Sequence, residues 1–329
     1  MQNNYSDEQL HLAARLYYVD GMGQSEVAKF VRVSQAKVSR LLAMARERGI
    51  VRITVADYDP RDRDLEARLR VQLGLKTAIV IKMVGGLGNA DLRKSIGLFA
   101  APSIEEFIQT GSVIAVAGGR TIHALVHSLS EPRNKMLTVV QSMGSVDSSV
   151  SAFDAQEVGR VLAQRLGGSF VAMNTPAYVS EKKMRDALMK LDQVVAVHAQ
   201  LNRANLALVG IGTLANSVFI ERGVINTGAI EDLRTAGAVG EVCGRFYDAN
   251  GNECNTGWRD LVMSVQLEQL RNIPNVIGVV SGTDRSASIL GAVKGGFLKG
   301  LVIDEPGARA LLADIPPAGR QPKIRKAKK

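Results

Sequence analysis

Apolar runs of five to seven residues recur through residues 76–315 and alternate with stretches of helical periodicity. Runs of this length that are rich in Val, Ile and Leu are typical of strands buried on both faces of a parallel sheet. The alternation therefore predicts an α/β fold with a mainly parallel sheet. The candidate strands are 77–81, 112–118, 136–142, 169–174, 194–198, 206–212, 276–282 and 300–304, and the candidate helices are 89–107, 121–128, 155–166, 181–190 and 286–295.

Residues 1–56 have a different pattern, which predicts a small separate domain. Ser6, Ser25 and Ser34 each precede a short stretch with apolar residues at helical spacing, as helix caps do. Gly49 ends the third helix, and residues 50–55 alternate apolar and polar side chains like a short strand. Three helices followed by a strand indicate a winged-helix-like helix-turn-helix domain.

The third of these helices carries polar side chains at its N-terminal end, which is the end that enters the major groove in helix-turn-helix proteins. Gln can pair with adenine, Lys and Arg can pair with guanine, and a helix N-terminus can hold a phosphate. An oligomerisation or protein-docking module is the alternative. The candidate DNA-binding residues are Ser25, Ser34, Gln35, Ala36, Lys37, Ser39 and Arg40.

Arg32 is the one residue that departs from the helix-turn-helix pattern, because it occupies a turn position where glycine is common. A left-handed backbone at a residue other than glycine costs about 1–2 kcal/mol. A packed domain can tolerate such a cost.

The net charge of +9 is unevenly distributed. Residues 1–55 have a net charge of +3, the last ten residues have +6, and the segment between them is neutral. Basic ends favour a polyanionic partner such as DNA, and 316–329 is expected to be a basic disordered tail. The two cysteines, the absence of a signal-peptide pattern and the lack of a long apolar run favour a cytoplasmic protein without a membrane segment.

Residues 57–75 are interpreted as a linker with a helix. The segment is charged and broken by Pro60, and then places Leu65, Leu69, Leu73 and Leu75 at or near helical spacing. Such a helix could connect two domains or form a dimer contact, but packing against the core is favoured.

Glycine and hydroxyl residues follow several of the predicted strands. In parallel sheets, ligands bind beyond the carboxyl ends of the strands, and backbone N–H groups at a helix N-terminus favour an anion. One such sequence is weak evidence, but four at one sheet edge predict an effector pocket. The candidate effector-binding residues at these strand ends are Gly118, Gly119, Arg120, Thr121, Gln141, Gly144, Gly212, Gly282 and Arg285.

Glu241 is a further effector-binding candidate, within the glycine-rich segment 237–255. Its carboxylate could accept hydrogen bonds from ligand hydroxyls, or it could hold the backbone of its own loop. Both readings remain open from the sequence.

The sequence contains no convincing enzyme motif. His123 and His127 lie four residues apart on a predicted helix, but no second set of metal ligands accompanies them, and no zinc, phosphate-loop or nucleophile-elbow pattern occurs. We therefore expect no metal site, no cofactor and no catalytic residues.

Six segments taken together resemble the SorC family of sugar-responsive bacterial transcriptional regulators. The resemblance covers about residues 8–315. The segments are LYYVDGMGQSEVAKFVRVSQAKVSRLLAMARERGIVRI (16–53), IAVAGGRT (114–121), NTPAYV (174–179), LVGIGTL (208–214), GAVGEVCGRFYDANG (237–251) and SGTDRSASILGAVKGGFLKGLVIDE (281–305).

The resemblance implies that residues 76–315 form an effector-binding and oligomerisation domain whose fold is similar to sugar-phosphate isomerases and deaminases. It also implies a sugar, polyol or sugar-phosphate effector, operator DNA and a dimer or homotetramer. The resemblance places Gly119, Arg120 and Thr121 in an anion-binding turn and Gln141 and Glu241 near ligand hydroxyls.

Two residues depart from the family pattern. Glu241 stands where Asp is commoner, and Arg285 stands where many members have Lys. An arginine can bind a carboxylate or phosphate but cannot form a Schiff base with an aldehyde effector, as a lysine can. A covalent link to the effector is therefore not expected.

The leading hypothesis is a DNA-binding transcriptional regulator of carbohydrate or polyol metabolism whose effector modulates operator binding. The alternatives are a sugar-phosphate isomerase or deaminase with an accessory DNA-binding domain, and a scaffold whose three-helix module docks another protein. Fold class alone does not decide between them.

Overall fold

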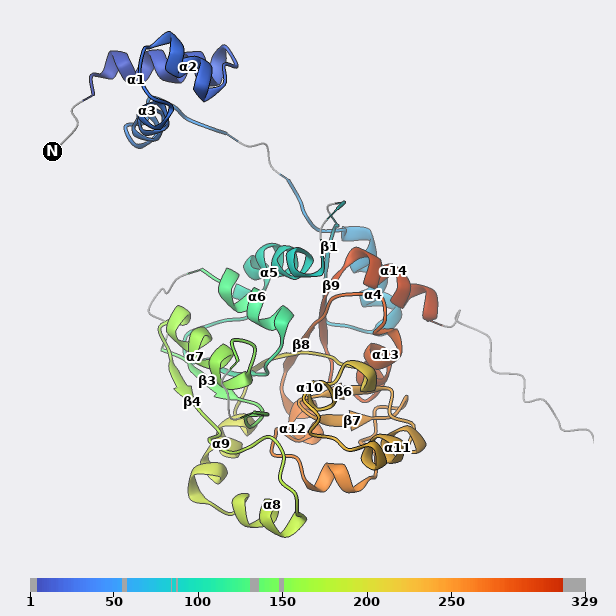
Figure 1. Ribbon diagram of the computed structural model, residues 1–329. Helices are drawn as coiled ribbons and strands as arrows, with labels where there is room; N and C mark the ends of the chain where they lie inside the picture. The colour runs from blue at the N-terminus through green and yellow to red at the C-terminus, as the bar shows by residue number, and fades with distance from the viewer. Residues whose placement is uncertain are drawn as a thin grey trace, which may run out of the picture. The chain divides into compact units, whose positions relative to one another are not determined.

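The computed structural model describes residues 5–54, 58–83, 85–86, 88–130, 136–147 and 151–315. The chain divides into two compact units, Met1–Asp59 and Pro60–Lys329, which are described separately below (Figure 1). The basic segment 316–329 lies outside the described residues, as do residues 55–57. No helix in the described part of the chain is long and apolar enough to cross a membrane.

The smaller unit is built from short helices packed around one apolar core. Their buried side chains recur at helical spacing, so each helix presents one apolar face to the others. The helices are α1 (Asp7–Ala14), continued by a π-helical turn η1 (Arg15–Val19), α2 (Gln24–Phe30) and α3 (Gln35–Glu47). The core comprises Tyr5, Leu10, Ala13, Ala14, Leu16, Val27, Ala28, Val38, Leu41, Leu42 and Ala45.

The predicted caps are confirmed for two of the three helices. The Ser6 hydroxyl accepts a hydrogen bond from the Gln9 N–H at 3.4 Å, and the Ser34 hydroxyl accepts from the Lys37 N–H at 3.2 Å. Ser25, in contrast, is wrong as a cap. It lies in the first turn of α2, whose N-cap is Gly23. The Glu26 carboxylate accepts from the Gly23 N–H at 2.7 Å and closes that turn.

Of two predictions about the backbone of this unit, one is confirmed and one is wrong. Arg32 adopts the left-handed conformation, with φ 53°, in the turn between α2 and α3. The predicted strand at 50–55 is wrong, because residues 50–54 form no strand and 52–54 are exposed. Within the described residues no partner strand pairs with this segment, so its alternating pattern has no sheet to join.

The larger unit contains a seven-stranded parallel sheet in the order β1-β9-β8-β5-β2-β3-β4. Strands such as β2 and β5 are buried at every position, as expected when helices cover both faces. The strands are β1 (Thr77–Ile81), β2 (Val113–Val116), β3 (Thr138–Gln141), β4 (Ser169–Val171), β5 (Leu206–Val209), β8 (Asn275–Val279) and β9 (Gly300–Asp304). The α/β fold class with a mainly parallel sheet is confirmed.

Helices and a small hairpin surround this sheet. The hairpin strands are β6 (Gly240–Val242) and β7 (Arg245–Tyr247). The helices are α4 (Arg63–Leu73), α5 (Asn89–Glu105), α6 (Arg120–Ser128), α7 (Ala155–Leu166), α8 (Lys182–Leu188), α9 (Asp192–Asn202), α10 (Val218–Glu221), α11 (Thr227–Thr235), α12 (Leu267–Asn272), α13 (Ser286–Lys294) and α14 (Glu305–Asp314), with 3-10 turns η2 (Leu214–Asn216) and η3 (Gly257–Asp260).

One predicted strand of this unit is wrong. Residues 194–198 lie inside α9, where Val194, Val197 and Leu201 are buried. Their spacing of three and four residues is helical, and it overrides the β propensity of the valines.

Helix α4 packs within the larger unit. Leu65 and Leu69 are buried, and the helix contacts β1 and α14. The adjoining Arg61 pairs with Ile81 in an isolated antiparallel bridge. The boundary between the compact units therefore falls between Asp59 and Pro60, before this helix.

Candidate functional site

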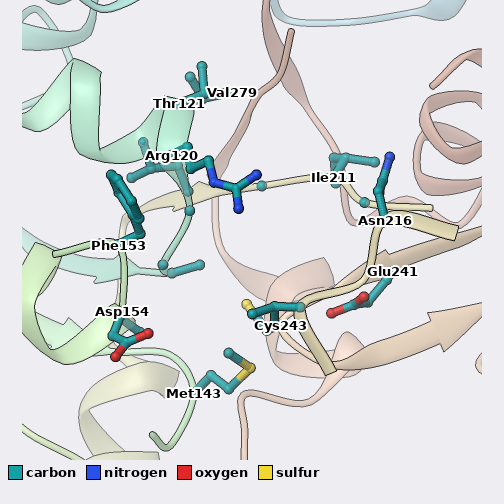
Figure 2. Close-up of a pocket in the computed structure, with 18 of the residues that line it drawn as sticks. Arg120, Thr121, Met143, Phe153, Asp154, Ile211, Asn216, Glu241, Cys243 and Val279 are labelled. Carbon is teal, nitrogen blue, oxygen red and sulfur yellow. The ribbon is translucent and has the colours of Figure 1, made fainter. Parts of the chain in front are cut away.

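A cavity of about 260 Å³ opens at the carboxyl ends of the central strands β2 and β5. These strands are neighbours in the sheet, but the chain leaves β2 towards β3 and β4 and returns to place β5 on the other side. Such a switch point leaves a crevice between the diverging connections, where ligands of α/β proteins bind. Figure 2 shows Arg120, Phe153 and Asp154 on one side of this cavity and Asn216, Glu241 and Cys243 on the other.

The turn from β2 into α6 forms one wall, and its glycines are required by local geometry. A side chain on Gly118 would place its Cβ 2.6 Å from the Phe153 carbonyl oxygen. Gly119 has φ 132° and ψ 149°, a conformation that essentially only glycine adopts. Gly119 is the N-cap of α6, and among the described residues no side chain caps that helix. The first turn therefore presents backbone N–H groups beside Arg120 and Thr121.

The opposite wall includes Glu241, which the hairpin brings against the end of β5. Gly212 and Glu241 exchange two backbone hydrogen bonds, of 2.9 and 3.0 Å. The Glu241 side chain is buried, and its carboxylate accepts from the Gly244 N–H at 3.2 Å. Burial raises the pKa of Glu241 to about 7, although Ser217, Gly244 and the charge of Arg285 act in the opposite direction. Near neutral pH this carboxyl can therefore donate or accept a proton in a hydrogen bond.

Arg285 is held at the same end of the sheet by backbone oxygens. Its guanidinium donates to the Ile211 carbonyl at 2.9 Å and to the Ser281 carbonyl at 3.2 Å. It also lies 3.3 Å from the Asn216 side-chain oxygen. These contacts fix the direction of the guanidinium while its charge remains only weakly paired, with the nearest Asp284 oxygen 3.7 Å away.

Two further arginines at the cavity form ion pairs between α6, α10 and the loop before α7. Arg120 donates to Glu221 at 2.7 Å, and both side chains are more than half exposed. Arg222 lies 3.3 Å from Asp154 and 3.7 Å from Asp147. The short segment that carries α10 is therefore connected to the opposite wall by three arginine–carboxylate pairs.

Most of the residues predicted to bind an effector are brought together at this cavity. Gly118, Gly119, Arg120, Thr121, Gly144, Gly212, Glu241 and Arg285 line it, whereas Gln141 and Gly282 do not. The lining also includes residues that the sequence did not single out. Most of them lie in helices or in loops without a glycine pattern, whereas Cys243 lies within the glycine-rich segment 237–255. These additional residues include Arg93, Phe153, Asp154, Asn216, Glu221, Arg222 and Cys243.

The two exceptions hold the surrounding backbone. The Gln141 side chain is buried, donates to the Met143 carbonyl at 2.7 Å and accepts from the Met173 N–H at 2.9 Å. The Gly282 N–H is already bound to the Asp304 carboxylate at 2.6 Å. These polar groups already have protein partners, so the assignment of Gln141 and Gly282 to the ligand stays a prediction that their positions outside the cavity lining do not support.

His123 and His127 pack their rings together with centroids 4.0 Å apart on α6. Burial, followed by the charge of His127, lowers the pKa of His123. Within the described residues, no group of three or more His, Cys, Asp or Glu side chains is arranged to hold a metal ion.

The candidate DNA-binding residues lie at the N-terminal end of α3 and in α2. Ser25, Ser34, Gln35, Ala36, Ser39 and Arg40 are exposed. Lys37 is partly buried, and its ammonium lies 5.3 Å from the centre of the Tyr5 ring. Helix α3 therefore presents a polar surface with two unpaired guanidinium groups in the described part of the chain, of which that of Arg40 lies nearer the N-terminal end and that of Arg46 lies in the last turn.

Known proteins match the larger unit by a family model and nearly the whole chain by sequence. A family model described as "Putative sugar-binding domain" matches residues 60–313. The chain is 30% identical over 315 residues to the deoxyribonucleoside regulator of Bacillus subtilis (strain 168), covering 92% of this chain and 96% of that protein. It is also 30% identical over 311 residues to the erythritol catabolism regulatory protein EryD of Brucella abortus (strain 2308), covering 93% and 97%.

A solved structure has a similar fold. The full-length sorbitol operon regulator SorC from Klebsiella pneumoniae matches with a TM-score of 0.75 at 27% identity, covering 94% of this chain and 100% of that chain. All three of these relatives are named as regulators and none as an enzyme. The family model over more than half of the sequence, together with relatives along nearly all of it, shows that this chain belongs to the SorC family of sugar-binding bacterial transcriptional regulators.

Proposed function

We propose that this regulator binds operator DNA through its three-helix unit and a sugar, polyol or sugar phosphate in the cavity, and that the ligand modulates DNA binding. The observation that carries the proposal is the cavity at the switch point of the sheet, lined by groups that match hydroxyls and anions. Relatives named as regulators of sorbitol, erythritol and deoxyribonucleoside metabolism support the class of ligand.

The cavity favours a small, hydroxyl-rich ligand. Its volume of about 260 Å³ lies just below the range of about 300–1,000 Å³ that is typical of small-molecule sites. Glu241 and Asn216 offer both acceptors and donors, and the first turn of α6 offers backbone donors. Arg120 and Arg285 add positive charge, so an anionic group on the ligand is compatible with the same site.

The three-helix unit is proposed to read DNA with α3. In helix-turn-helix proteins the N-terminal residues of the second helix of the motif contact base edges, and here Gln35 and Arg40 are exposed at that end. Proteins of this class read two half-sites as dimers, so we propose a dimer or tetramer formed through the larger unit.

Regulation then requires a difference in affinity between two states. If the ligand binds one of the two states more tightly, it shifts the population towards that state. The DNA affinity then falls or rises, according to which state the ligand prefers. By linkage, DNA changes the ligand affinity by the same factor.

Arg40→Ala tests the DNA half, with Arg15→Ala as a matched control that removes one exposed arginine from the same unit. Loss of a base contact from Arg40 is expected to cost about 1–3 kcal/mol, or about 5- to 150-fold in affinity. Fluorescence anisotropy with labelled DNA from upstream of the chain's own gene measures this. Equal affinity of the two variants would refute the assignment of α3 as the reading helix.

A thermal-shift screen of sugars, polyols and their phosphates tests the ligand half, because a ligand that binds only the folded state stabilises it by mass action. Thr121→Ala and Arg285→Ala are each expected to weaken the response to the ligand that the screen identifies. A ligand that stabilises both variants as much as the natural protein binds elsewhere, and would contradict the proposed site.

A further inference from the structure

Arg93 is a cavity residue that neither the sequence pattern nor the comparisons assign to any role. It lies on α5, in the first crossover of the sheet, and is half-buried. The other three arginines that line the cavity all have oxygen partners within 3.3 Å. Arg93 has no hydrogen bond or ion pair in the described part of the chain, so its charge is uncompensated.

Arg93 is also close enough to two of those arginines to be affected by their charges. Burial, followed by the positive charges of Arg120 and Arg285, lowers the pKa of the Arg93 guanidinium. These groups come from α5, the first residue of α6 and the residue before α13, so three separate elements bring them to the same cavity. Like charges gathered in this way repel one another.

We propose that Arg93 is a specificity-determining residue of the effector site, which with Arg120 and Arg285 binds a phosphomonoester group and so selects a phosphorylated effector over the neutral sugar or polyol. The proposal rests on the proposed function of the cavity and names the chemistry of its ligand.

The charge of the cluster favours a dianion. The charge of Arg120 is balanced by Glu221, but that pair is exposed on both sides and an anion can displace it. Arg285 is held mainly by neutral carbonyl oxygens and Asn216, so its charge is largely available. With Arg120 released from Glu221, the three arginines carry three positive charges, and the Glu241 carboxylate offsets one of them when it is ionised at about pH 8. The remaining two positive charges match a phosphate dianion better than a monoanion.

The neighbouring backbone has the complementary geometry for the remaining phosphate oxygens. The uncapped first turn of α6 begins at Arg120, so its N–H groups and the Thr121 hydroxyl lie beside the cluster. A phosphate has several acceptor oxygens and can bind helix N–H groups and guanidinium groups at the same time.

Inorganic phosphate is the probe for a direct test, because the natural effector is not identified. Isothermal titration calorimetry at about pH 8 and fixed ionic strength compares the full-length natural protein with Arg93→Ala and Lys94→Ala. At this pH phosphate is mainly a dianion. Lys94 is the matched control because it lies on the same helix, is 77% exposed and does not line the cavity. Sodium acetate is titrated in parallel as a monoanion.

The expected result is measurable phosphate binding that falls about tenfold or more in Arg93→Ala and is unchanged in Lys94→Ala, with no comparable binding of acetate. Phosphate binding that is equal in Arg93→Ala and the natural protein would overturn the role of Arg93. Absence of phosphate binding by the natural protein, or acetate binding of similar strength, would overturn the phosphomonoester assignment.

A second readout separates binding from folding. Trp258, the chain's single tryptophan, is buried in the larger unit, so its fluorescence follows unfolding there. Without phosphate, the unfolding midpoint of Arg93→Ala is expected to stay the same or rise, because a repelling charge is removed. A fall would indicate a structural role and contradict the proposal, and Arg93→Gln, which keeps most of the aliphatic stem, repeats the test if the alanine variant does not fold.

These measurements use no DNA. Failure of the Arg40→Ala experiment would therefore leave the phosphate result standing. Conversely, a neutral polyol that binds normally to Arg93→Ala and changes DNA affinity would refute the role of Arg93 while supporting the proposed function.

Discussion

Substitution of Glu241 by glutamine is predicted to change how the stability of the larger unit depends on pH. Glu241 is buried, with a pKa of about 7 against an ordinary value of 4.5. The folded state therefore keeps a proton that the unfolded state has already lost between these two values, so stability falls as pH rises through this window. Above about pH 7 the full loss is present, and it disappears below about pH 4.5.

The size of the effect follows from the shift. A difference of 2.5 between the two pKa values corresponds to at most about 3 kcal/mol at high pH. Between about pH 5 and pH 8.5 the natural protein should lose about 2–3 kcal/mol from this group. Glu241→Gln has nearly the same shape and no titrating proton. Its stability relative to the natural protein should therefore increase by that amount over the same range.

Urea unfolding followed by the fluorescence of Trp258 measures the free energy of unfolding of the larger unit at both pH values. Glu268→Gln, on a side chain that is 70% exposed, is the control for loss of one charge. A difference between Glu241→Gln and the natural protein that is the same at both pH values would refute the reasoning. So would an equal change in the Glu268→Gln control.

Three further substitutions test how the fold positions the two candidate sites. Gly118→Ala places a Cβ 2.6 Å from the Phe153 carbonyl oxygen, so it should weaken ligand binding and lower the melting temperature of the larger unit by several degrees; an unchanged melting curve would contradict the close approach. Gln141→Leu removes two buried hydrogen bonds and should destabilise that unit by about 1–3 kcal/mol while leaving the ligand affinity of the folded protein nearly unchanged; a selective loss of ligand affinity would instead support the prediction that Gln141 binds the ligand. Ser34→Ala removes the cap of α3 and should lower the unfolding free energy of the three-helix unit by about 1 kcal/mol, measured by circular dichroism at 222 nm; no loss would show that the capping hydrogen bond contributes little.

The fold class and most of the cavity could be predicted because their signals are local. Gly118 and Gly119 follow a buried apolar run, and parallel strands bring all such turns to one edge of the sheet. The side-chain direction at the end of a strand is not local information. Gln141 also ends a buried strand, yet its side-chain amide forms hydrogen bonds with the backbone of Met143 and Met173.

Arg93 shows the limit of the local approach more clearly. In the sequence it is one charged residue in a long amphipathic helix, and such residues usually face solvent. Its place at the cavity follows from the crossover between β1 and β2, a feature of the whole topology. The error at 194–198 has a related cause, because three valines favour a strand locally while the burial of one face selects a helix.

The most direct test of the central claim is a DNA titration by fluorescence anisotropy with and without a ligand found by thermal shift. If the cavity controls the three-helix unit, the ligand should change the DNA affinity of the natural protein by about 5- to 150-fold. The same ligand concentration should have much less effect on Arg285→Ala, whose DNA affinity without ligand should be close to that of the natural protein. A ligand that changes the DNA affinity of both proteins equally, or of neither while binding in the cavity, would contradict the account.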